Sequence, residues 1–267
     1  MQRFTTVEIL MITLISFGTY FILDEMYFRD MRSWLNGTIG QMGISHIVSY
    51  AVFGIPMFVG ALIIHGRTNL TKSLGLKEPM WKGAFFAFLC TLPMFMGFAI
   101  FFKFNTELTL NGILINGLAA AFFEELYYRG FLFGQLYRYT KWGFIPSVLI
   151  GALVFGFVHI YQGTGLYETL GIFLITFLGG ILFAWAYAEW NYNIWVPIFL
   201  HLFMNLAWDM FSVSDTALGG IYSNVFRVAT IALIIILTLL YKKRNGMDLE
   251  VGKKSIWLRS ESGQPKN

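Results

Sequence analysis

Long runs of apolar residues, each 17 to 23 residues in length, alternate along the chain with short polar stretches. A helix needs about 20 apolar residues to cross the hydrocarbon core of a bilayer. The strands of a membrane β-barrel are shorter, near ten residues, and alternate in polarity. The pattern therefore predicts about eight transmembrane helices, at residues 7–23, 44–64, 83–102, 111–133, 144–160, 168–188, 194–211 and 221–241.

The composition agrees with this interpretation. Hydrophobic residues make up 57% of the 267 positions and charged residues 13%, whereas soluble domains are about a quarter charged. These values exclude a soluble enzyme, a disordered chain and a fibrous repeat. The single cysteine, Cys90, excludes an internal disulfide and a cysteine-based metal cage. We predict an all-α, polytopic membrane helical bundle that forms one membrane-embedded domain over residues 1–267.

The basic residues in the loops indicate how the protein is oriented. With eight spans, 14 Lys and Arg residues fall on the side that holds both termini, and three fall on the other side. Because cytoplasmic loops carry the excess of Lys and Arg, both termini are predicted to be cytoplasmic. No small-residue cleavage site follows the first span, so we expect it to stay in the mature protein. Residues 242–267 form a basic cytoplasmic tail that suits anionic lipid headgroups.

Ionisable residues inside apolar spans are costly and indicate function by default. The fourth span contains EELYYR, in which Glu125 and Arg129 are spaced so that they can pair on one helix face. Glu124 points about 100° away and has no partner in its own helix. A carboxylate without a partner beside one that is already paired is a candidate general base. The alternative is an ion-pair cluster that only holds helices together.

Two later spans carry histidines with helical spacing to a second residue. The fifth ends in FGFVH, with Phe155 and His159 four residues apart. An imidazole at this position can hydrogen-bond a carboxylate from another helix, or it can be a satisfied buried histidine. The seventh span contains HLFMN, which places His201 and Asn205 on one helix face. Donors fixed in this way can stabilise a developing oxyanion.

The three boxes together, EExxxR, FxxxH and HxxxN on separate spans, resemble the CPBP family. This family comprises CAAX proteases and bacteriocin-processing enzymes, is also called Abi, and includes the type II CAAX prenyl endopeptidase. The resemblance covers about residues 110–210, the expected catalytic core. It implies an intramembrane endopeptidase in which Glu124 activates a water and His159 orients or shares its proton. Glu125 and Arg129 would support the box, and His201 and Asn205 would form the oxyanion site.

The resemblance leaves metal dependence and substrate open. The family is often labelled metalloprotease, and Glu124, His159 and His201 could supply three ligands to a zinc ion. We favour no metal, because a glutamate-activated water with a His/Asn oxyanion site uses every residue. Expected partners are membrane lipid and a peptide or protein substrate at the membrane, with or without a prenyl group, and not nucleic acid. Alternatives are a bacteriocin-processing or self-immunity protein and a non-enzymatic membrane scaffold or regulator.

One feature of the predicted spans is inconsistent with a shared water. If the fourth span ends at residue 133, Glu124 lies about 13 Å from the cytoplasmic end, at 1.5 Å per residue. His159, counted from the start of the fifth span, lies about 22 Å deep. Side chains that act on one water should lie at equal depth.

Overall fold

The computed structural model describes residues 4–259, and within them the chain forms helices and no β-strand. Every predicted apolar run coincides with helical structure, which confirms the all-α bundle. The elements are α1 (Thr6–Ile39), α2 (Met42–Phe53), α3 (Ile55–Ser73), α4 (Met80–Phe101), α5 (Leu110–Gly112), η1 (Ile113–Phe133), α6 (Gly134–Tyr139), α7 (Phe144–Phe157), η2 (Ile160–Gln162), α8 (Leu166–Glu189), α9 (Trp195–Met210) and α10 (Ile221–Arg244).

Five helices in residues 4–259 are long and apolar enough to span a bilayer, or six if the bent pair α2 and α3 counts as one span. The protein is therefore an integral, multi-pass membrane protein, but the predicted count of eight spans is not confirmed. Two of the predicted spans fall short for physical reasons. Helix α9 has only 16 residues, and η1 carries three charged residues in 21.

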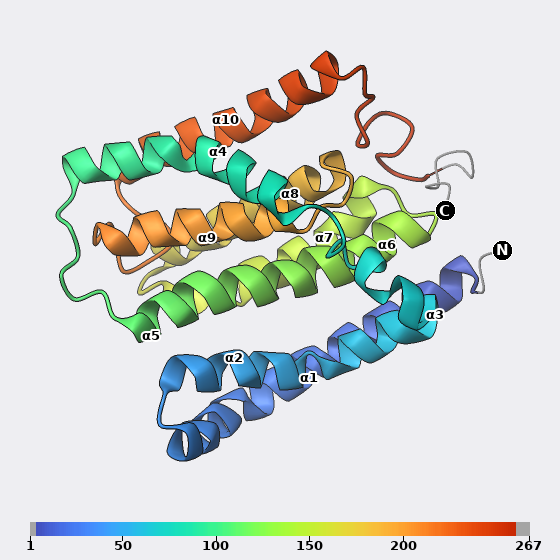
Figure 1. Cartoon of the computed structure of the whole chain (residues 1–267), viewed down its shortest axis with the longest axis horizontal. Helices are drawn as coiled ribbons and strands as arrows, with labels where there is room; N and C mark the ends of the chain where they lie inside the picture. The colour runs from blue at the N-terminus through green and yellow to red at the C-terminus, as the bar shows by residue number, and fades with distance from the viewer. Residues whose placement is uncertain (1–3, 260–267) are drawn as a thin grey trace.

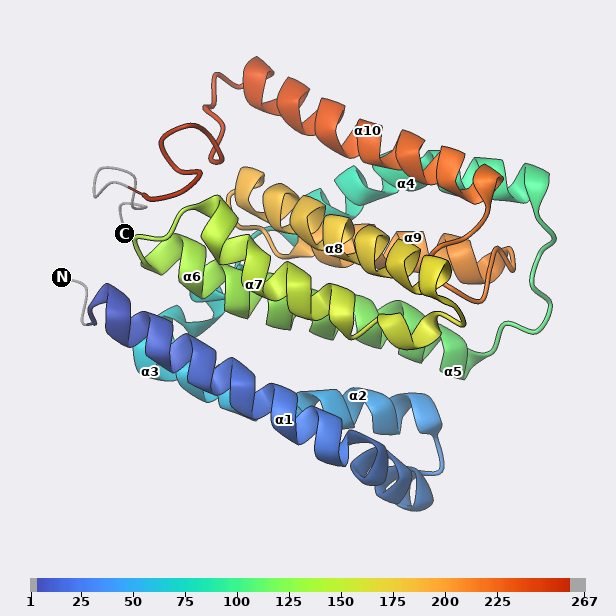
Figure 2. The ribbon, with the colours of Figure 1, turned by 180° about the vertical axis from the view of Figure 1, so that it is seen from behind.

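Element η1 lies between two groups of helices (Figure 1, Figure 2). Helices α1, α2 and α3 pack on one side, and α9, α4 and α10 follow on the other, with α7 and α8 alongside. T-shaped contacts from Phe17 to Tyr128 and from Tyr20 to Tyr127 join α1 to η1, with ring centroids 5.3 Å and 5.0 Å apart. Because η1 contacts both groups of helices, its polar side chains can interact with residues of either group.

Element η1 is a π-helix, in which backbone hydrogen bonds run to the fifth residue back. The expectation of ordinary α-helical angles around EELYYR is therefore wrong. Such geometry is rare, appears mostly as single turns, and occurs frequently at functional sites. It widens the helix where Glu124, Glu125 and Arg129 lie, while Glu125 and Arg129 still meet as a pair.

The predicted end of the fourth span at residue 133 is also wrong, because the helix continues directly into α6 as far as Tyr139. Glu124 lies 15 residues before Tyr139, and His159 lies 15 residues after Phe144, where α7 begins. Counted in this way, the two residues lie at similar depth. The mismatch inferred from the sequence arose from ending the span where the apolar run ends, since α6 reads GQLYRY.

The predicted basic tail is largely a docked segment. Helix α10 continues to Arg244, and residues 245–259, here called the strap, fold back over the end of the bundle at which α1 begins (Figure 1). Residues 260–267 of the predicted tail lie outside the described residues, as does Arg3. Lys253 and Lys254 of the strap are exposed and remain available for lipid headgroups.

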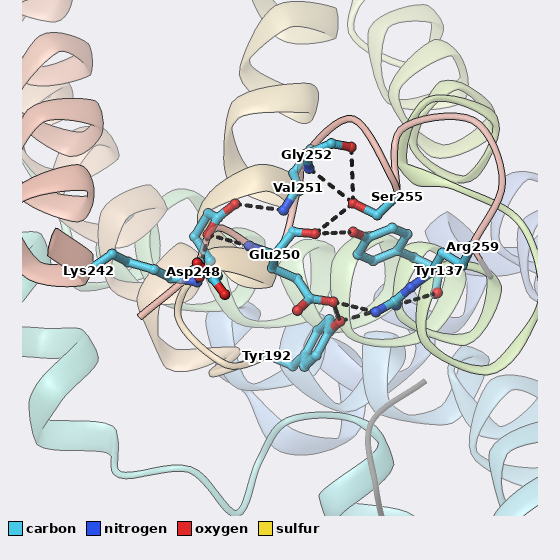
Figure 3. Close-up of polar contacts among 10 residues, drawn as sticks. Tyr137, Tyr192, Lys242, Asp248, Glu250, Val251, Gly252, Ser255 and Arg259 are labelled. Carbon is cyan, nitrogen blue, oxygen red and sulfur yellow. Dashed lines mark hydrogen bonds and ion pairs between the residues drawn. The ribbon is translucent and has the colours of Figure 1, made fainter. Parts of the chain in front are cut away.

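A buried carboxylate, Glu189 at the end of α8, holds the start of the strap, of which Figure 3 shows Glu250 and Val251. It forms an ion pair with Lys242 at 2.7 Å. It also accepts the backbone N–H groups of Glu250 and Val251, at 3.0 Å and 2.9 Å. Buried charges are retained only when paired and hydrogen-bonded. The Lys242 expected in a solvated tail therefore has a structural role.

The rest of the strap caps the N-terminal end of α7 with hydrogen bonds. Backbone N–H groups of residues 143–145 donate to carbonyls of residues 255–257 at 2.8–2.9 Å. These are amides that the end of a helix otherwise leaves without partners. Arg259 donates to the carbonyl of Tyr137 and pairs with Glu250. Burial raises the pKa of Tyr192 and the Glu250 carboxylate raises it further, so Tyr192 stays protonated and donates to Glu250.

We predict that Glu189→Gln lowers the free energy of unfolding by about 3 kcal/mol, because it leaves the Lys242 ammonium buried without a counter-charge. Thermal unfolding in detergent measures the effect. The matched control is Glu107→Gln, on an exposed loop at the other end of the bundle. Equal melting temperatures for the two variants would contradict a structural role for the strap.

Candidate functional site

The centre of the site is the carboxylate of Glu125, which is 0% exposed. Its Oε1 atom accepts from Arg129 Nη1 at 3.0 Å and lies 2.8 Å from His201 Nδ1. A carboxylate only accepts, so the Nδ1 of His201 must carry a proton. The predicted pair of Glu125 and Arg129 is confirmed. The contact with His201 joins the first and third boxes, on η1 and α9, and was not anticipated for Glu125.

The second box joins the site through Phe155. The Arg129 guanidinium lies 4.4 Å from the centroid of the Phe155 ring, a cation–π distance. The His159 ring lies 4.5 Å from the same ring. Arg129 is also near Gly180 of α8, where an added Cβ would come within 3.4 Å of Nη2 and within 3.3 Å of Ala152. The aromatic residue of FxxxH thus packs on the cation of EExxxR.

The tautomer of His159 follows from its contact. Nδ1 lies 2.7 Å from the backbone carbonyl of Phe155. A carbonyl only accepts, so Nδ1 carries the proton and Nε2 of the neutral ring is left as an acceptor. His159 follows the last turn of α7 and is half-buried. It therefore offers a proton acceptor from a fixed ring.

Glu124 differs from its neighbour in exposure and in hydrogen bonding, although Oε2 of Glu125 is also buried without a partner. Glu124 is half-buried and forms no hydrogen bond within residues 4–259, and its Oε2 atom is buried without a partner. The groups that it affects electrostatically are Asp24, Tyr50 and Tyr128. The first two belong to α1 and α2. The adjacent carboxylates therefore face different groups of helices, Glu125 towards α9 and Glu124 towards α1 and α2.

Asn205, one turn after His201 on α9, donates from Nδ2 to the backbone carbonyl of Asn116 at 2.7 Å. Its amide is thus held against η1 by an exposed hydrogen bond. Sequence reasoning missed Asn116 and Asp24. Each was visible as a polar residue beside an apolar run, ILINGLAAAF for Asn116 and FILDEMYF for Asp24.

The structure thus joins Glu125, Arg129 and His201 directly, and His159 through Phe155. It does not bond Glu124 or Asn205 to them. Among residues 4–259, no three His, Cys, Asp or Glu side chains lie close enough to hold a metal ion. The alternative ligand set of Glu124, His159 and His201 is therefore not brought together as a metal-binding group in this part of the chain. A metal-free site stays a prediction.

A groove of about 600 Å³ lies between α1 and the end of α7, and its lining reaches Val158, the residue before His159 in the sequence. It is almost entirely apolar, with one carboxylate, Glu25, among its lining side chains. The lining residues are Phe17, Gly18, Phe21, Glu25, Val154, Phe157 and Val158. An apolar groove with one polar group is a typical binding site for an apolar ligand that carries a polar end.

Comparison with known proteins agrees with the geometry. Residues 106–207 match the family described as Type II CAAX prenyl endopeptidase Rce1-like. This range contains all six predicted site residues, so the resemblance inferred from the three boxes is confirmed there. Over 93 residues the chain is 36% identical to a protein of Bacillus subtilis (strain 168) named "Putative membrane peptidase YdiL". The match spans about a third of each protein, 35% of this chain and 34% of that one. No solved structure matches the chain.

We predict that Arg129→Met destabilises the protein by about 3–5 kcal/mol, because it leaves the Glu125 carboxylate buried with its charge poorly compensated. Denaturant or thermal unfolding in detergent measures the change. The double variant Glu125→Gln/Arg129→Met removes both charges, and we expect it to be more stable than Arg129→Met alone. A double variant that is destabilised by the sum of the two single effects would show that the two residues do not interact.

Proposed function

We propose that the protein is an intramembrane endopeptidase that hydrolyses a peptide bond near the C-terminus of a substrate reaching the bilayer. The observation that carries the proposal is the Glu125, Arg129 and His201 cluster, which lies inside the segment that matches the Rce1-like family. The name of the Bacillus subtilis relative, a membrane peptidase, points to the same reaction class.

In this proposal, Glu124 is the general base. Glu125 already accepts hydrogen bonds from Arg129 and His201. Glu124 has no such partner among the described residues, so its carboxylate can accept a hydrogen bond from a water. Glu124 removes a proton from that water as the water oxygen attacks the scissile carbonyl. The same proton then passes to the leaving amine when the C–N bond breaks. Nε2 of His159, the free acceptor on its ring, hydrogen-bonds the same water and orients it.

His201 and Asn205 supply the oxyanion site. Glu125 fixes the His201 ring through Nδ1, so that Nε2 points to a constant position, and it stabilises the doubly protonated ring that donates from Nε2. Asn205 is in place one turn away, where one N–H of its amide donates to the Asn116 carbonyl and the other remains to donate to substrate. Hydrogen bonds that form only in the transition state raise the rate rather than the affinity.

The apolar groove between α1 and α7 supports a lipid-modified peptide as substrate. A prenyl chain would occupy the groove lined by Phe17, Phe21 and Phe157, with the peptide extending towards His159. The excess of basic residues in the loops supports a cytoplasmic position for both termini, and so for the strap.

We predict that the wild-type protein in detergent cleaves a quenched fluorescent farnesylated CAAX peptide and that Glu124→Gln abolishes cleavage without lowering the melting temperature. The substitution removes the base and leaves the Glu125 ion pairs intact. Asp30→Asn, an exposed carboxylate of α1, is the control variant. Full activity in Glu124→Gln, or no cleavage of this peptide by the wild type, would contradict the proposal.

The same assay in the presence of a strong chelator tests whether cleavage requires a metal ion. We expect cleavage to persist, since the mechanism uses only protein side chains and water. Loss of activity with chelator, restored by added zinc, would overturn the metal-free reaction. An unprenylated peptide of the same sequence, run alongside, tests whether the groove contributes to binding.

We predict that Asn205→Ala lowers kcat by about 10²–10³-fold with little change in KM, as expected for one lost oxyanion donor. Steady-state kinetics on the farnesylated peptide measure both constants. A change confined to KM would place Asn205 in ground-state binding instead.

A further inference from the structure

We infer that Gln162 of η2 and Arg227 of α10 are positioning residues for His159, which they hold through the loop between α9 and α10. This loop, residues 211–220, is here called the α9–α10 loop. The inference rests on the proposed function in so far as His159 orients the water there. It goes beyond that function because Arg227 and the loop lie outside the segment that matches the family.

The turn that carries His159 has little structure of its own to hold it. His159 follows the last turn of α7 and leads into η2, a 3₁₀ helix of three residues. Its N–H donates to the Gly156 carbonyl at 3.3 Å, and its carbonyl accepts the N–H of Gln162 at 3.2 Å. Tyr161, between them, is 80% exposed. A fixed position for this turn therefore depends on a contact from elsewhere in the chain.

The side chain of Gln162 provides that contact. Its Oε1 atom accepts the backbone N–H of Ala217, in the α9–α10 loop, at 2.9 Å. The two residues lie 55 positions apart, so the hydrogen bond joins segments that are distant in the sequence. The backbone N–H of the same glutamine closes the turn at His159. The α9–α10 loop is thus linked to the candidate site through one half-buried side chain.

Arg227 holds the other polar group of the same loop residue. The carbonyl of Ala217 accepts from Arg227 Nη2 at 2.7 Å, and hydrogen bonds from a charged donor are stronger than neutral ones. The guanidinium lies 4.5 Å from the centroid of the Trp208 ring on α9, a cation–π distance. Arg227 forms no ion pair with the residues that the structure describes. A cation inside an apolar span is costly, and here the loop contact rather than a counter-charge accounts for it.

Further contacts keep the α9–α10 loop in place against three helices. Trp208 Nε1 of α9 donates to the Ser214 carbonyl at 3.0 Å. Asn224 Nδ2 of α10 donates to the Leu218 carbonyl at 3.0 Å. Leu218 packs so closely on Gly171 of α8 that a Cβ added to this glycine would lie 2.7 Å from Cδ1 of the leucine. The helices therefore fix the loop, and the loop fixes the turn that carries His159.

This arrangement gives Gln162 and Arg227 a part in the reaction without contact with the substrate. In the proposed mechanism, Nε2 of His159 hydrogen-bonds the attacking water, so the orientation of the water depends on where the ring lies. A displacement of about 1 Å in such a group can cost about 100-fold in rate. Because orientation of the water acts on the chemical step, the effect belongs to kcat and not to KM.

Steady-state kinetics on the farnesylated peptide test this role. We expect Gln162→Ala to lower kcat about tenfold without changing KM, and Gln162→Glu, which keeps the acceptor oxygen, to restore it. Arg227→Met should act in the same way. The variant with both Gln162→Ala and Arg227→Met should be no slower than the slower single variant, because both residues act through one loop. Losses that multiply in the double variant would overturn the shared route.

The matched control is Gln41→Ala. Gln41 also accepts a backbone N–H through its side chain, at the start of α2, but has no contact with the α9–α10 loop. We expect its kcat to equal that of the wild type. A tenfold lower kcat in this control as well would show that the loss is not specific to the turn at His159, and would overturn the role of Gln162.

The ¹⁵N signals of the His159 ring, assigned with His159→Gln, give a readout that does not depend on activity. We expect them to shift in Gln162→Ala and Arg227→Met but not in Gln162→Glu or Gln41→Ala, while the His201 signals stay in place in all four. His159 signals that do not move in Gln162→Ala overturn the positioning role and leave the peptidase proposal intact. Movement of both rings would indicate a general loss of packing and would overturn it too. The expected shifts in a protein that cleaves no peptide support the positioning and overturn the proposed function.

Discussion

The buried charge of Glu125 is the constraint on which the rest of the site depends. A charged side chain near the bilayer centre costs about 2.5–3.5 kcal/mol on insertion scales. Arg129 and His201 offset this cost through a single carboxylate oxygen. Arg129 in turn requires the Phe155 ring and the small residue Gly180 beside it. Satisfying one charge therefore brings η1, α7, α8 and α9 together.

Two adjacent carboxylates of η1 can serve different purposes because neighbouring residues of a helix point in different directions. Glu125 faces α9 and accepts two hydrogen bonds at Oε1, whereas Glu124 faces α1 and α2 and has no hydrogen bond among the described residues. A base needs free lone pairs, and an orienting group needs fixed partners. Structure and reactivity are thus divided between neighbouring residues of one helix. The strap supports this arrangement from the end of the bundle, because it contacts α6, which continues η1, and the start of α7.

The sequence was informative where a property is local. Each predicted apolar run coincides with helical structure, although α1 continues past residue 23 to Ile39, and the four-residue spacing predicted the pair of Glu125 and Arg129. Properties set by packing between distant segments were not predictable. The partner of His201 on η1 and the strap held by Glu189 depend on how distant segments pack together. The end of the fourth span was misplaced because α6 is polar in composition yet continues the helix.

The most direct test of the account is the ¹⁵N NMR spectrum of the His201 side chain in detergent, with labelled histidine. The chain has four histidines, so His201→Gln assigns the signals. The account predicts that Glu125→Gln shifts the His201 Nδ1 resonance and that Glu124→Gln leaves it unchanged. A shift caused by Glu124→Gln but not by Glu125→Gln would show that the two carboxylates have been assigned the wrong roles.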